Sequence, residues 1–505
     1  MESRGAGDGL KRAQATVEIE KGGAGARGGA AGGSVVGSGT GTAAAQPGAR
    51  RLHLVGIGGS GMASLAAYLL GRGDLVSGCD QKDGALLRLL RARGARIEIG
   101  HDAAHLHGGA DSLIHTAAAG LDHPELAGAA AREIPIRKYA RFLGDETRRR
   151  RCVAVAGTHG KTTTTTLVAD LLIAGGRDPS AVVGGFPLAW ELPGRAGRGE
   201  EFVVEACEYD RSFTNFEPHV ALVTNVEPDH LDYFGTHENV VRAFEDFLRN
   251  VRRDGFAVLH ESAARQIDLA VVGGRVLVVG ESADADARLE PLAADERGLR
   301  GRLTVRGHAP LELAPALPGD HNLVNAALAA TAALAVGVAP AAIEATIRAA
   351  RGVRRRLEPL GTRGGVHFLS DYAHHPTEIR AVRLALRASH PMRRLIVVFQ
   401  PHQASRTRDF RSEFARELAL FDEVVVPNIF SVRESQEGVE HETARLLEAI
   451  AGNGRTPVRA HGLDDVFATV RGLAREGDVV VLMGAGDIDD LAEELRGATR
   501  EAGVA

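Results

Sequence analysis

Short apolar runs alternate with longer amphipathic segments along most of this chain. From residue 51 onward, runs rich in Val, Leu and Ile are separated by stretches whose apolar residues recur at helical spacing. The short runs are typical of buried strands, and the longer stretches are typical of helices that cover a sheet. Regular alternation of the two predicts an α/β fold with parallel sheets.

The predicted strands fall into three blocks. The first contains "RLHLVGI", "DLVSGC", "ARIEIG" and "SLIHTA". After a linker region near "LGDETRRRR", the second runs from "CVAVAGTHGKT" through "EFVVEA" and "VALVTNVEPDH" to the Ala-rich helices that follow "LPGDHNLVNAALAA". The third starts near "RRRLEPLGTRGG" and carries "VHFLSDYAHH", "LIVVFQPH", "EVVVPNIF" and "DVVVLMGAGD". We predict three nucleotide-fold domains, at residues 50–149, 150–357 and 358–505.

Residues 1–49 differ in composition from the rest of the chain. They are mostly Gly, Ala and Ser with scattered charges, and such a segment buries too little apolar surface to offset the entropy of ordering. We therefore predict a disordered tail. No basic start with an apolar core follows the first residue, so a signal peptide is not expected. The sequence contains no apolar run long enough to cross a membrane.

Composition and charge narrow the class of protein. A chain of 505 residues is too long for one ordinary core, and 44% hydrophobic with 25% charged residues is typical of a globular protein. The net charge of −5 gives no electrostatic case for binding nucleic acid. The three cysteines follow neither a disulfide nor a metal spacing, which suits a reducing cytoplasm.

The stretch "GTHGKTTTT", residues 157–165, follows the apolar run "CVAVA" directly. A strand, a glycine-bounded loop and a Lys-Thr pair opening a helix form a nest of backbone N–H groups around a phosphate. Lys161, the last lysine of an Arg-rich chain, would reach the β- and γ-phosphates, and the Thr162 hydroxyl would bind Mg²⁺. Arginine is planar and bulkier, so it cannot replace a compact ammonium inside this loop. The central domain is therefore predicted to be a P-loop ATPase domain.

A second glycine motif lies in the first block. In "GIGGSGM", Gly56, Gly58 and Gly61 follow a strand, and Asp80 ends the next strand, where an acid can bind ribose hydroxyls. Alone, this motif fits a dinucleotide enzyme or glycines with a purely structural role. With an ATP loop in the next block, a second diphosphate ligand is favoured over NAD.

Two strand ends of the middle block offer metal ligands. Glu205 ends "FVVEA", and His230 ends "VALVTNVEPDH". An acid and a histidine on neighbouring strands can hold Mg²⁺ near the phosphate loop, although a lone histidine is often a satisfied core residue. In the third block, the pair His374 and His375 lacks a third ligand at zinc spacing.

Motifs in all three blocks, over roughly residues 50 to 490, resemble the Mur ligase family, the ATP-dependent amide ligases of peptidoglycan assembly. "AGTHGKTTTT" is similar to the family's phosphate loop, "TNVEPDHLDYF" to its central strand and metal histidine, and "GDHNLVNAALA" and "GVRRRLE" to segments that face the nucleotide. "GIGGSGM", "SDYAHHPTEI", "FQPHQASRT" and "GAGDI" are most similar to the member that acts first. The resemblance implies Rossmann-like first and third domains around the central ATPase domain.

The resemblance also implies roles for individual residues. The implied catalytic residues are Lys161, His374 and Arg406, with Arg406 facing the carboxylate of the amino acid. The implied ATP-binding residues are Gly157, Thr158, His159, Gly160, Lys161, Thr162, Thr163, Asn322, Arg356 and Asp371. The implied UDP-sugar residues are Gly56, Gly58, Gly59, Ser60, Gly61 and Asp80. The implied metal ligands are Thr162, Glu205 and His230. Some relatives have Arg where this chain has Gln403, which leaves a second carboxylate contact there open.

The implied reaction joins L-alanine to UDP-N-acetylmuramate. ATP phosphorylates the sugar carboxylate, and the amine then attacks the acyl phosphate, giving ADP and phosphate with Mg²⁺ as cofactor. Positioning and charge neutralisation supply most of the catalysis in phosphoryl transfer. Three other readings stay open: a recycling ligase that adds a tripeptide to the same sugar, a nicotinamide dehydrogenase, and a nucleotide-sensing regulator without turnover. The dehydrogenase leaves "GTHGKTT" without a role, and the regulator has no need of Asp371, His374 and Arg406.

One further position bears on the metal site. Several later Mur ligases hold a second Mg²⁺ with a carbamylated lysine about fifteen residues after the metal histidine. The segment after His230 contains no lysine, and Glu245 stands at that distance. A carboxylate is chemically close to a carbamate as a Mg²⁺ ligand. Glu245 is therefore either a metal-site residue or a solvated residue on a helix face.

Overall fold

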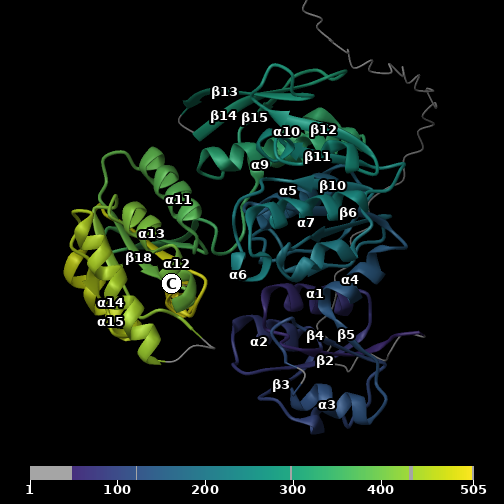
Figure 1. Cartoon of the computed structure of the whole chain (residues 1–505), viewed down its shortest axis with the longest axis horizontal. Helices are drawn as coiled ribbons and strands as arrows, with labels where there is room; N and C mark the ends of the chain where they lie inside the picture. The colour runs from purple at the N-terminus through teal and green to yellow at the C-terminus, as the bar shows by residue number, and fades with distance from the viewer. Residues whose placement is uncertain (1–47, 121, 296–297, 432–435, 503–505) are drawn as a thin grey trace, which may run out of the picture. The chain divides into compact units, whose positions relative to one another are not determined.

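The structure is a computed structural model that describes residues 48–120, 122–295, 298–431 and 436–502 (Figure 1). The described strands form three sheets, each assembled from one continuous part of the sequence. The predicted α/β fold with three domains is confirmed. Residues 1–47 of the predicted tail lie outside the described residues.

The first sheet has the strand order β3-β2-β1-β4-β5, with every neighbouring pair parallel. Its strands are β1 (Arg51–Val55), β2 (Leu75–Asp80), β3 (Arg96–Ile99), β4 (Ser112–His115) and β5 (Ile136–Lys138). Its helices are α1 (Ser60–Gly71), α2 (Ala85–Ala92), α3 (Pro124–Ala131) and α4 (Tyr139–Thr147), with a short 3₁₀ turn at Ala103–Leu106. In the predicted linker near "LGDETRRRR", the residues "LGDET" form the end of α4, and β6 begins at Arg151.

The central sheet has the order β15-β14-β13-β12-β11-β10-β6-β9-β7-β8. Its strands are β6 (Arg151–Ala156), β7 (Ser180–Val182), β8 (Gly194–Arg195), β9 (Glu201–Glu205), β10 (Val220–Val223), β11 (Phe256–His260), β12 (Arg275–Gly280), β13 (Ala287–Asp295), β14 (Gly298–Val305) and β15 (Leu311–Leu313). The strands around β6 are parallel, whereas β13, β14 and β15 form an antiparallel extension.

Two cores cover the two faces of the central sheet. One face packs against α5 (Lys161–Ala174), α9 (Asp320–Ala335) and α10 (Pro340–Ala349), and the other packs against α7 (His237–Arg249). The many alanines of α9 leave little side-chain bulk between this helix and α5, and most of the α9 residues are buried. This close packing fixes the axis of α5, whose first residues carry the phosphate-loop motif. The remaining short elements are 3₁₀ turns and helices at Tyr209–Asn215, Leu231–Phe234 (α6), Glu261–Ala264 (α8) and Leu269–Val271.

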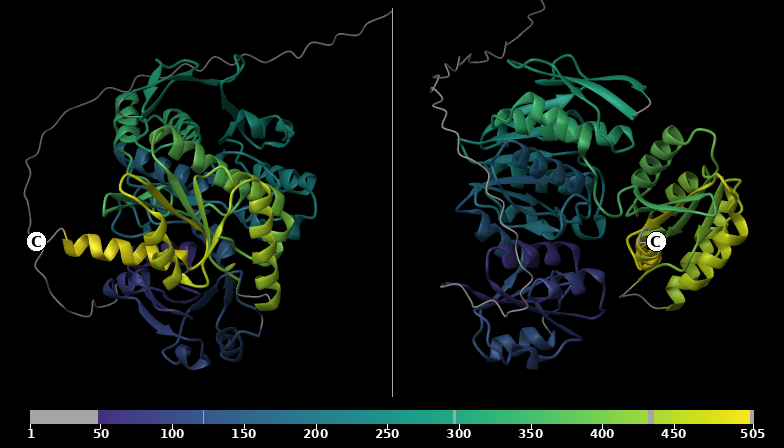
Figure 2. Two further views of the ribbon diagram at one scale, coloured as in Figure 1. Left: turned by 90° about the vertical axis from the view of Figure 1, so that its left-hand side faces the viewer. Right: turned by 180° about the vertical axis from the view of Figure 1, so that it is seen from behind.

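The third sheet has the order β16-β17-β21-β18-β19-β20. Its strands are β16 (Glu358–Arg363), β17 (Val366–Asp371), β18 (Leu395–Gln400), β19 (Glu423–Val426), β20 (Val458–Arg459) and β21 (Val479–Gly484). Its helices are α11 (Pro376–Ser389), α12 (Ala404–Asp409), α13 (Arg411–Leu418), α14 (Gln436–Gly452), α15 (Leu463–Leu473) and α16 (Ile488–Ala502). Helices pack on both faces (Figure 2), and every residue of β18 and β21 is buried, as expected for central parallel strands.

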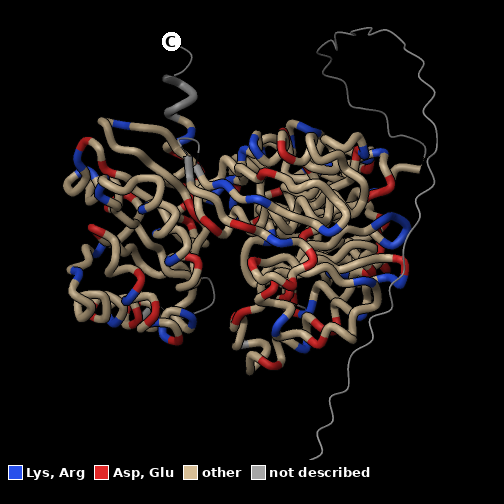
Figure 3. Tube along the Cα trace, turned by 90° about the horizontal axis from the view of Figure 1, so that it is seen from above, with Lys and Arg blue, Asp and Glu red and all other residues tan. Residues whose placement is uncertain are grey.

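The described residues carry both signs of charge. Basic and acidic residues are interspersed along the trace in Figure 3, in keeping with the nearly balanced composition. Among the helices of the described residues, none combines the length and the apolar character needed to cross a membrane.

Candidate active site

The loop between β6 and α5 can be built only with glycine at its two ends. Gly157 has φ +139°, and a Cβ there would lie 1.8 Å from the Thr224 hydroxyl oxygen. Gly160 has φ +81°, and a Cβ there would lie 2.6 Å from the side-chain oxygen of Asn325. These positions let the loop pass close to its neighbours while the N-terminal amides of α5 stay open to an anion. The cradle fits the phosphates of a nucleotide.

The side chain of Lys161 lies inside this loop. Its ammonium donates to the carbonyl oxygens of Gly157 at 2.6 Å and Thr158 at 2.9 Å, and to the Glu208 carboxylate at 3.0 Å. Burial lowers the pKa of the ammonium, but the charge of Glu208 outweighs burial and raises the pKa above its ordinary value. Lys161 therefore carries a full positive charge within the phosphate loop.

Two of the three predicted metal ligands lie together. The Thr162 hydroxyl donates to a Glu205 carboxylate oxygen at 3.1 Å, and the other Glu205 oxygen accepts from the Gly184 amide at 2.8 Å. Glu205 ends β9, as predicted. A hydroxyl beside a carboxylate is a set of hard oxygen donors that fits Mg²⁺.

The third predicted ligand, His230, is not at a strand end. Strand β10 stops at Val223, and His230 lies in the following loop with φ +52°, directly before α6. Its ring groups with the carboxylates of Glu208 and Asp229, one ligand atom from each lying within 4.8 Å of the others. Because Glu208 also contacts Lys161, this second group adjoins the phosphate loop. Sequence reasoning missed Glu208 as a site residue.

A small cavity of about 170 Å³ collects most of the predicted ATP-binding residues. Its lining includes His159, Gly160, Thr162, Thr163, Asn322, Arg356 and Asp371. The remaining three, Gly157, Thr158 and Lys161, belong to the adjoining loop. The Asp371 carboxylate accepts from the amides of Leu357 at 2.7 Å and Ala373 at 2.8 Å. Burial raises the pKa of Asp371 to about 6.

The phosphate loop is tied to the third sheet's first helix through His159. Its ring lies 3.5 Å from a carboxylate oxygen of Glu227 and 3.3 Å from one of Glu378 on α11. Burial lowers the pKa of His159, but the two nearby carboxylates outweigh burial and raise it to about 9. Glu378 also pairs with Arg356 at 3.7 Å and accepts from the His374 amide at 3.0 Å. Glu227 and Glu378 were not among the predicted site residues.

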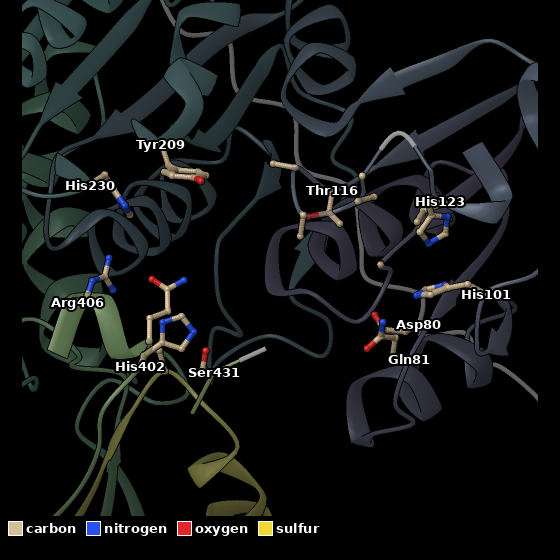
Figure 4. A pocket seen from close by; sticks show the side chains of 18 of the residues that line it. Asp80, Gln81, His101, Thr116, His123, Tyr209, His230, His402, Arg406 and Ser431 are labelled. Atoms are coloured by element: carbon tan, nitrogen blue, oxygen red, sulfur yellow. The ribbon is translucent and has the colours of Figure 1, made fainter. Parts of the chain in front are cut away.

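A larger cleft of about 1060 Å³ is lined by residues from all three domains (Figure 4). Arg406 on α12 and His230 face the same side of this cleft, and the Arg406 guanidinium lies 3.4 Å from the Asp229 carboxylate. The His374 ring contacts the Tyr372 carbonyl oxygen at 3.0 Å, and burial lowers its pKa to about 4. His374 is therefore neutral at physiological pH.

The opposite wall of the cleft is formed by the first sheet. Gly56, with φ +75°, and Asp80 line it, and a Cβ on Gly56 would lie 2.9 Å from the Thr116 methyl group. The Gly58 amide donates to Asp80 at 2.8 Å, so this acid also holds the glycine loop in place. Gly59 caps α1, Ser60 begins it, and Gly61 packs against the Tyr139 ring. The predicted UDP-sugar residues are thus in the loop before α1, in the first turn of α1 and at Asp80.

Comparisons with known proteins match all three parts of the chain. Three models of the Mur ligase family match the chain. The model of the catalytic domain matches residues 51–151, that of the middle domain residues 155–333, and that of the glutamate ligase domain residues 355–486. A UDP-N-acetylmuramate–L-alanine ligase of Halorhodospira halophila is 39% identical in sequence. The alignment covers 90% of this chain and 95% of the length of that ligase. The chain belongs to the Mur ligase family.

Other relatives agree with this assignment. A UDP-N-acetylmuramate–L-alanine ligase of Kineococcus radiotolerans is 41% identical over 88% of this chain and 95% of its own. The crystal structure of UDP-N-acetylmuramate–alanine ligase from Thermotoga maritima has a TM-score of 0.76 and 26% identity, over 90% of this Mur ligase and all of that chain. A murein peptide ligase from Psychrobacter arcticus shares the fold with a TM-score of 0.69 at 23% identity.

The structure also shows what surrounds Glu245 of this Mur ligase. Glu245 lies on α7, where its carboxylate accepts from the Asp268 amide at 3.1 Å and lies 3.8 Å from the Arg249 guanidinium. It belongs to neither of the two groups of metal-capable side chains found among the described residues. These contacts indicate that Glu245 anchors a neighbouring loop.

Proposed function

We propose that this Mur ligase joins L-alanine to UDP-N-acetylmuramate with ATP, as a UDP-N-acetylmuramate–L-alanine ligase. Relatives that carry this name align with about nine-tenths of the chain. The reaction gives ADP and phosphate and supplies a precursor of peptidoglycan, on which cell shape and division depend. A nicotinamide dehydrogenase and a non-catalytic nucleotide sensor are not favoured.

The observation that carries the proposal is the place of Arg406. Its guanidinium faces the large cleft next to Asp229 and His230. A cation that can bind a carboxylate therefore lies beside the group of His230, Asp229 and Glu208, which could hold a metal ion. Arginine binds carboxylates through paired hydrogen bonds. An α-amino acid held there would present its amine towards the cleft that Gly56 and Asp80 also line.

We assign roles to the remaining site residues on the same basis. The loop from Gly157 to Thr163 would bind the ATP phosphates. Asn322 would contact the adenine, Arg356 would face the nucleotide, and Asp371 would bind the ribose. Thr162 and Glu205 in one group, and His230 in the second, would serve the Mg²⁺ ions, which neutralise phosphate charge when bound. Gly56, Gly58, Gly59, Ser60, Gly61 and Asp80 would bind the UDP part of the sugar nucleotide.

The chemistry then depends on positioning and charge. ATP supplies a phosphoryl group to the sugar carboxylate, which converts a poor leaving oxygen into phosphate. Lys161 lies where it can neutralise negative charge during this transfer, and preorganised charge of this kind is a large part of enzymatic catalysis. His374 lies in the same cleft as Arg406 and is neutral, so it can contact the reacting groups without repelling a protonated amine.

Phosphate release separates the proposed reaction from its alternatives. The assay measures phosphate formed from ATP with UDP-N-acetylmuramate, alone and with L-alanine or with the tripeptide that a recycling ligase would use. We expect release that requires both UDP-N-acetylmuramate and L-alanine. Release that requires the tripeptide would identify a recycling ligase, and nucleotide binding without any release would identify a sensor.

Three further expectations belong to this proposal. We place the domain boundaries at residues 149/150 and 357/358. We propose that the protein works in the cytoplasm, where its nucleotide substrates are made. Its partners would be the small-molecule substrates, with no role for nucleic acid or a membrane.

A further inference from the structure

A cluster of histidine, cysteine and glutamate side chains lies under the first sheet's glycine loop, away from the ATP site. Glu125, at the start of α3, is fully buried and receives three side chains on its carboxylate. These are His53 Nε2 at 2.7 Å, Cys79 Sγ at 2.9 Å and His105 Nδ1 at 2.8 Å. His101 Nδ1 lies 3.1 Å from the Cys79 sulfur. Side chains from separate elements of the first domain thus place nitrogen and sulfur atoms around the Glu125 carboxylate.

We propose that this cluster is a binding site for a single zinc-type transition-metal ion, with Cys79, His53, Glu125 and His101 as its ligands. Within the described residues, His53, Cys79 and Glu125 form one of two groups whose ligand atoms all lie within 4.8 Å of one another. One sulfur, two imidazole nitrogens and one carboxylate oxygen are a ligand set typical of tetrahedral Zn²⁺. His101 is outside this group of three: its Nδ1 is 3.1 Å from the Cys79 sulfur but 4.0 Å from the Glu125 carboxylate, so its ring would have to move inward to complete a set of metal bonds of about 2.0–2.3 Å.

The surroundings have the features that support metal ligands. His53 Nδ1 lies 2.9 Å from the Ser77 hydroxyl, so the ring can donate there and keep Nε2 free for a metal. His105 and the Asp102 amide, at 3.3 Å, hold the second oxygen of Glu125. His101 also lines the large cleft, which gives an ion a way in.

Charge balance also favours a divalent ion. The Glu125 carboxylate accepts from the side chains of His53, Cys79 and His105. Without metal, the Cys79 thiol keeps its proton and donates a hydrogen bond to Glu125. On binding, that proton leaves to solvent, and the thiolate with the carboxylate neutralises the two charges of the ion. A serine hydroxyl would serve a hydrogen-bond network as well as a thiol does, whereas a zinc-type ion prefers the thiolate.

The cluster is mechanically connected to the glycine loop. The Cys79 carbonyl oxygen accepts from the Gly56 amide at 2.9 Å and from the Ile57 amide at 3.1 Å. An ion held by Cys79 would therefore stiffen the loop that lines the cleft. An effect on the UDP-sugar rests on the proposed function, but metal binding itself does not, and the test below measures binding alone.

The test uses the purified full-length protein freed of metal by chelation. Co²⁺ is added in the presence of excess Mg²⁺, which occupies hard-oxygen sites, and thiolate-to-cobalt absorption is recorded. We expect one Co²⁺ per chain with a tetrahedral, thiolate-type spectrum that Zn²⁺ abolishes. Cys79→Ser should remove the thiolate band, and His53→Gln should weaken binding at least about tenfold.

Two matched controls separate this cluster from other groups. Cys207→Ser removes an exposed thiol next to Glu208, and His107→Gln removes an exposed imidazole near His105 in sequence. Both should keep the spectrum of the unaltered protein. If the Cys79 variant does not fold, X-ray absorption of the zinc-loaded unaltered protein decides, because it should show one sulfur neighbour. Absence of a thiolate spectrum, a zinc ion without a sulfur neighbour, or a band that persists in Cys79→Ser would overturn the proposal.

Discussion

The ammonium of Lys161 occupies a space that matches its size. Three oxygen atoms, from Gly157, Thr158 and Glu208, surround it within 3.0 Å, and its side chain is only 14% exposed. A guanidinium is planar and larger than an ammonium, and it prefers to donate two parallel hydrogen bonds to a carboxylate or phosphate. It cannot enter the same loop without displacing the loop backbone. An Arg-rich chain therefore keeps a lysine at this position.

We predict that Lys161→Arg lowers turnover at least about a hundredfold, in the range seen when a key electrostatic group is removed. The measurement is steady-state phosphate release, with circular dichroism to check folding. Lys138→Arg is the matched control, because Lys138 is 60% exposed and pairs with Asp210 on the surface. That control should keep its activity. Near-normal turnover of Lys161→Arg would show that the loop needs only a charge.

Arg406 supports a second prediction at the scale of one residue. A hydrogen bond to a charged group contributes about 1.5–3 kcal/mol, so Arg406→Ala should raise the KM for L-alanine roughly ten- to a hundredfold. The KM for ATP should change little. Arg408→Ala is the control, since Arg408 is exposed and pairs only with neighbouring Asp409 among the described contacts. Equal weakening of all three substrates would indicate general damage to the third domain.

At the scale of elements, helix α7 decides a question about the metal site. Its described residues include no lysine, and Glu245 is engaged with the Asp268 amide and Arg249. Arginine stays protonated in proteins and cannot form a carbamate. No side chain of α7 can therefore take the carbamate role found in several later Mur ligases.

We predict that turnover is independent of bicarbonate. The enzyme is assayed in CO₂-depleted buffer, and bicarbonate is then added at constant pH and ionic strength. Glu245→Gln should retain activity within a few-fold, because it alters a loop contact. Reproducible several-fold activation by bicarbonate would mean that the metal site has been misread.

Sequence patterns predicted the long central strands better than the short or peripheral ones. Strands β1, β6, β18 and β21 are buried apolar runs, which a sequence reveals directly. Strand β5 was not predicted, because its three residues are all exposed and show no apolar period. The antiparallel strands β13 and β14 carry Pro291 and many charges, so they do not resemble core strands.

In the candidate site, too, local sequence motifs predicted some residues and missed others. The glycine-bounded loop and Glu205 were predicted because local motifs carry them. Glu208 was missed because its position depends on the backbone that follows it, where Asp210 and Arg211 both adopt φ above +50° without being glycines. Glu378 was missed because it is the acidic residue of a helix capping box, and only the fold brings it to His159. Such contacts come from tertiary packing, which no local pattern encodes.

At the scale of the whole molecule, His159 links the phosphate loop to α11. Its ring interacts with Glu227 and Glu378, and its pKa is raised from 6.5 to about 9 because these carboxylates outweigh burial. A group whose pKa is raised in the folded state stabilises that state fully below its unfolded pKa. The contribution is lost as the pH rises through the folded pKa. Here the window runs from about pH 6.5 to about pH 9.

We predict that the ligand-free protein loses stability across this window and that His159→Gln removes much of the loss. The upper bound is about 3.5 kcal/mol, from roughly 1.4 kcal/mol for each pKa unit. Thermal melting of both proteins is recorded at steps between pH 6 and pH 9.5. The unaltered protein should melt higher than the variant at pH 6, and the difference should shrink towards pH 9.5. His107→Gln, which removes an exposed imidazole, should follow the unaltered protein throughout. A constant difference at every pH would show that His159 contributes packing instead of a charged link between the phosphate loop and α11.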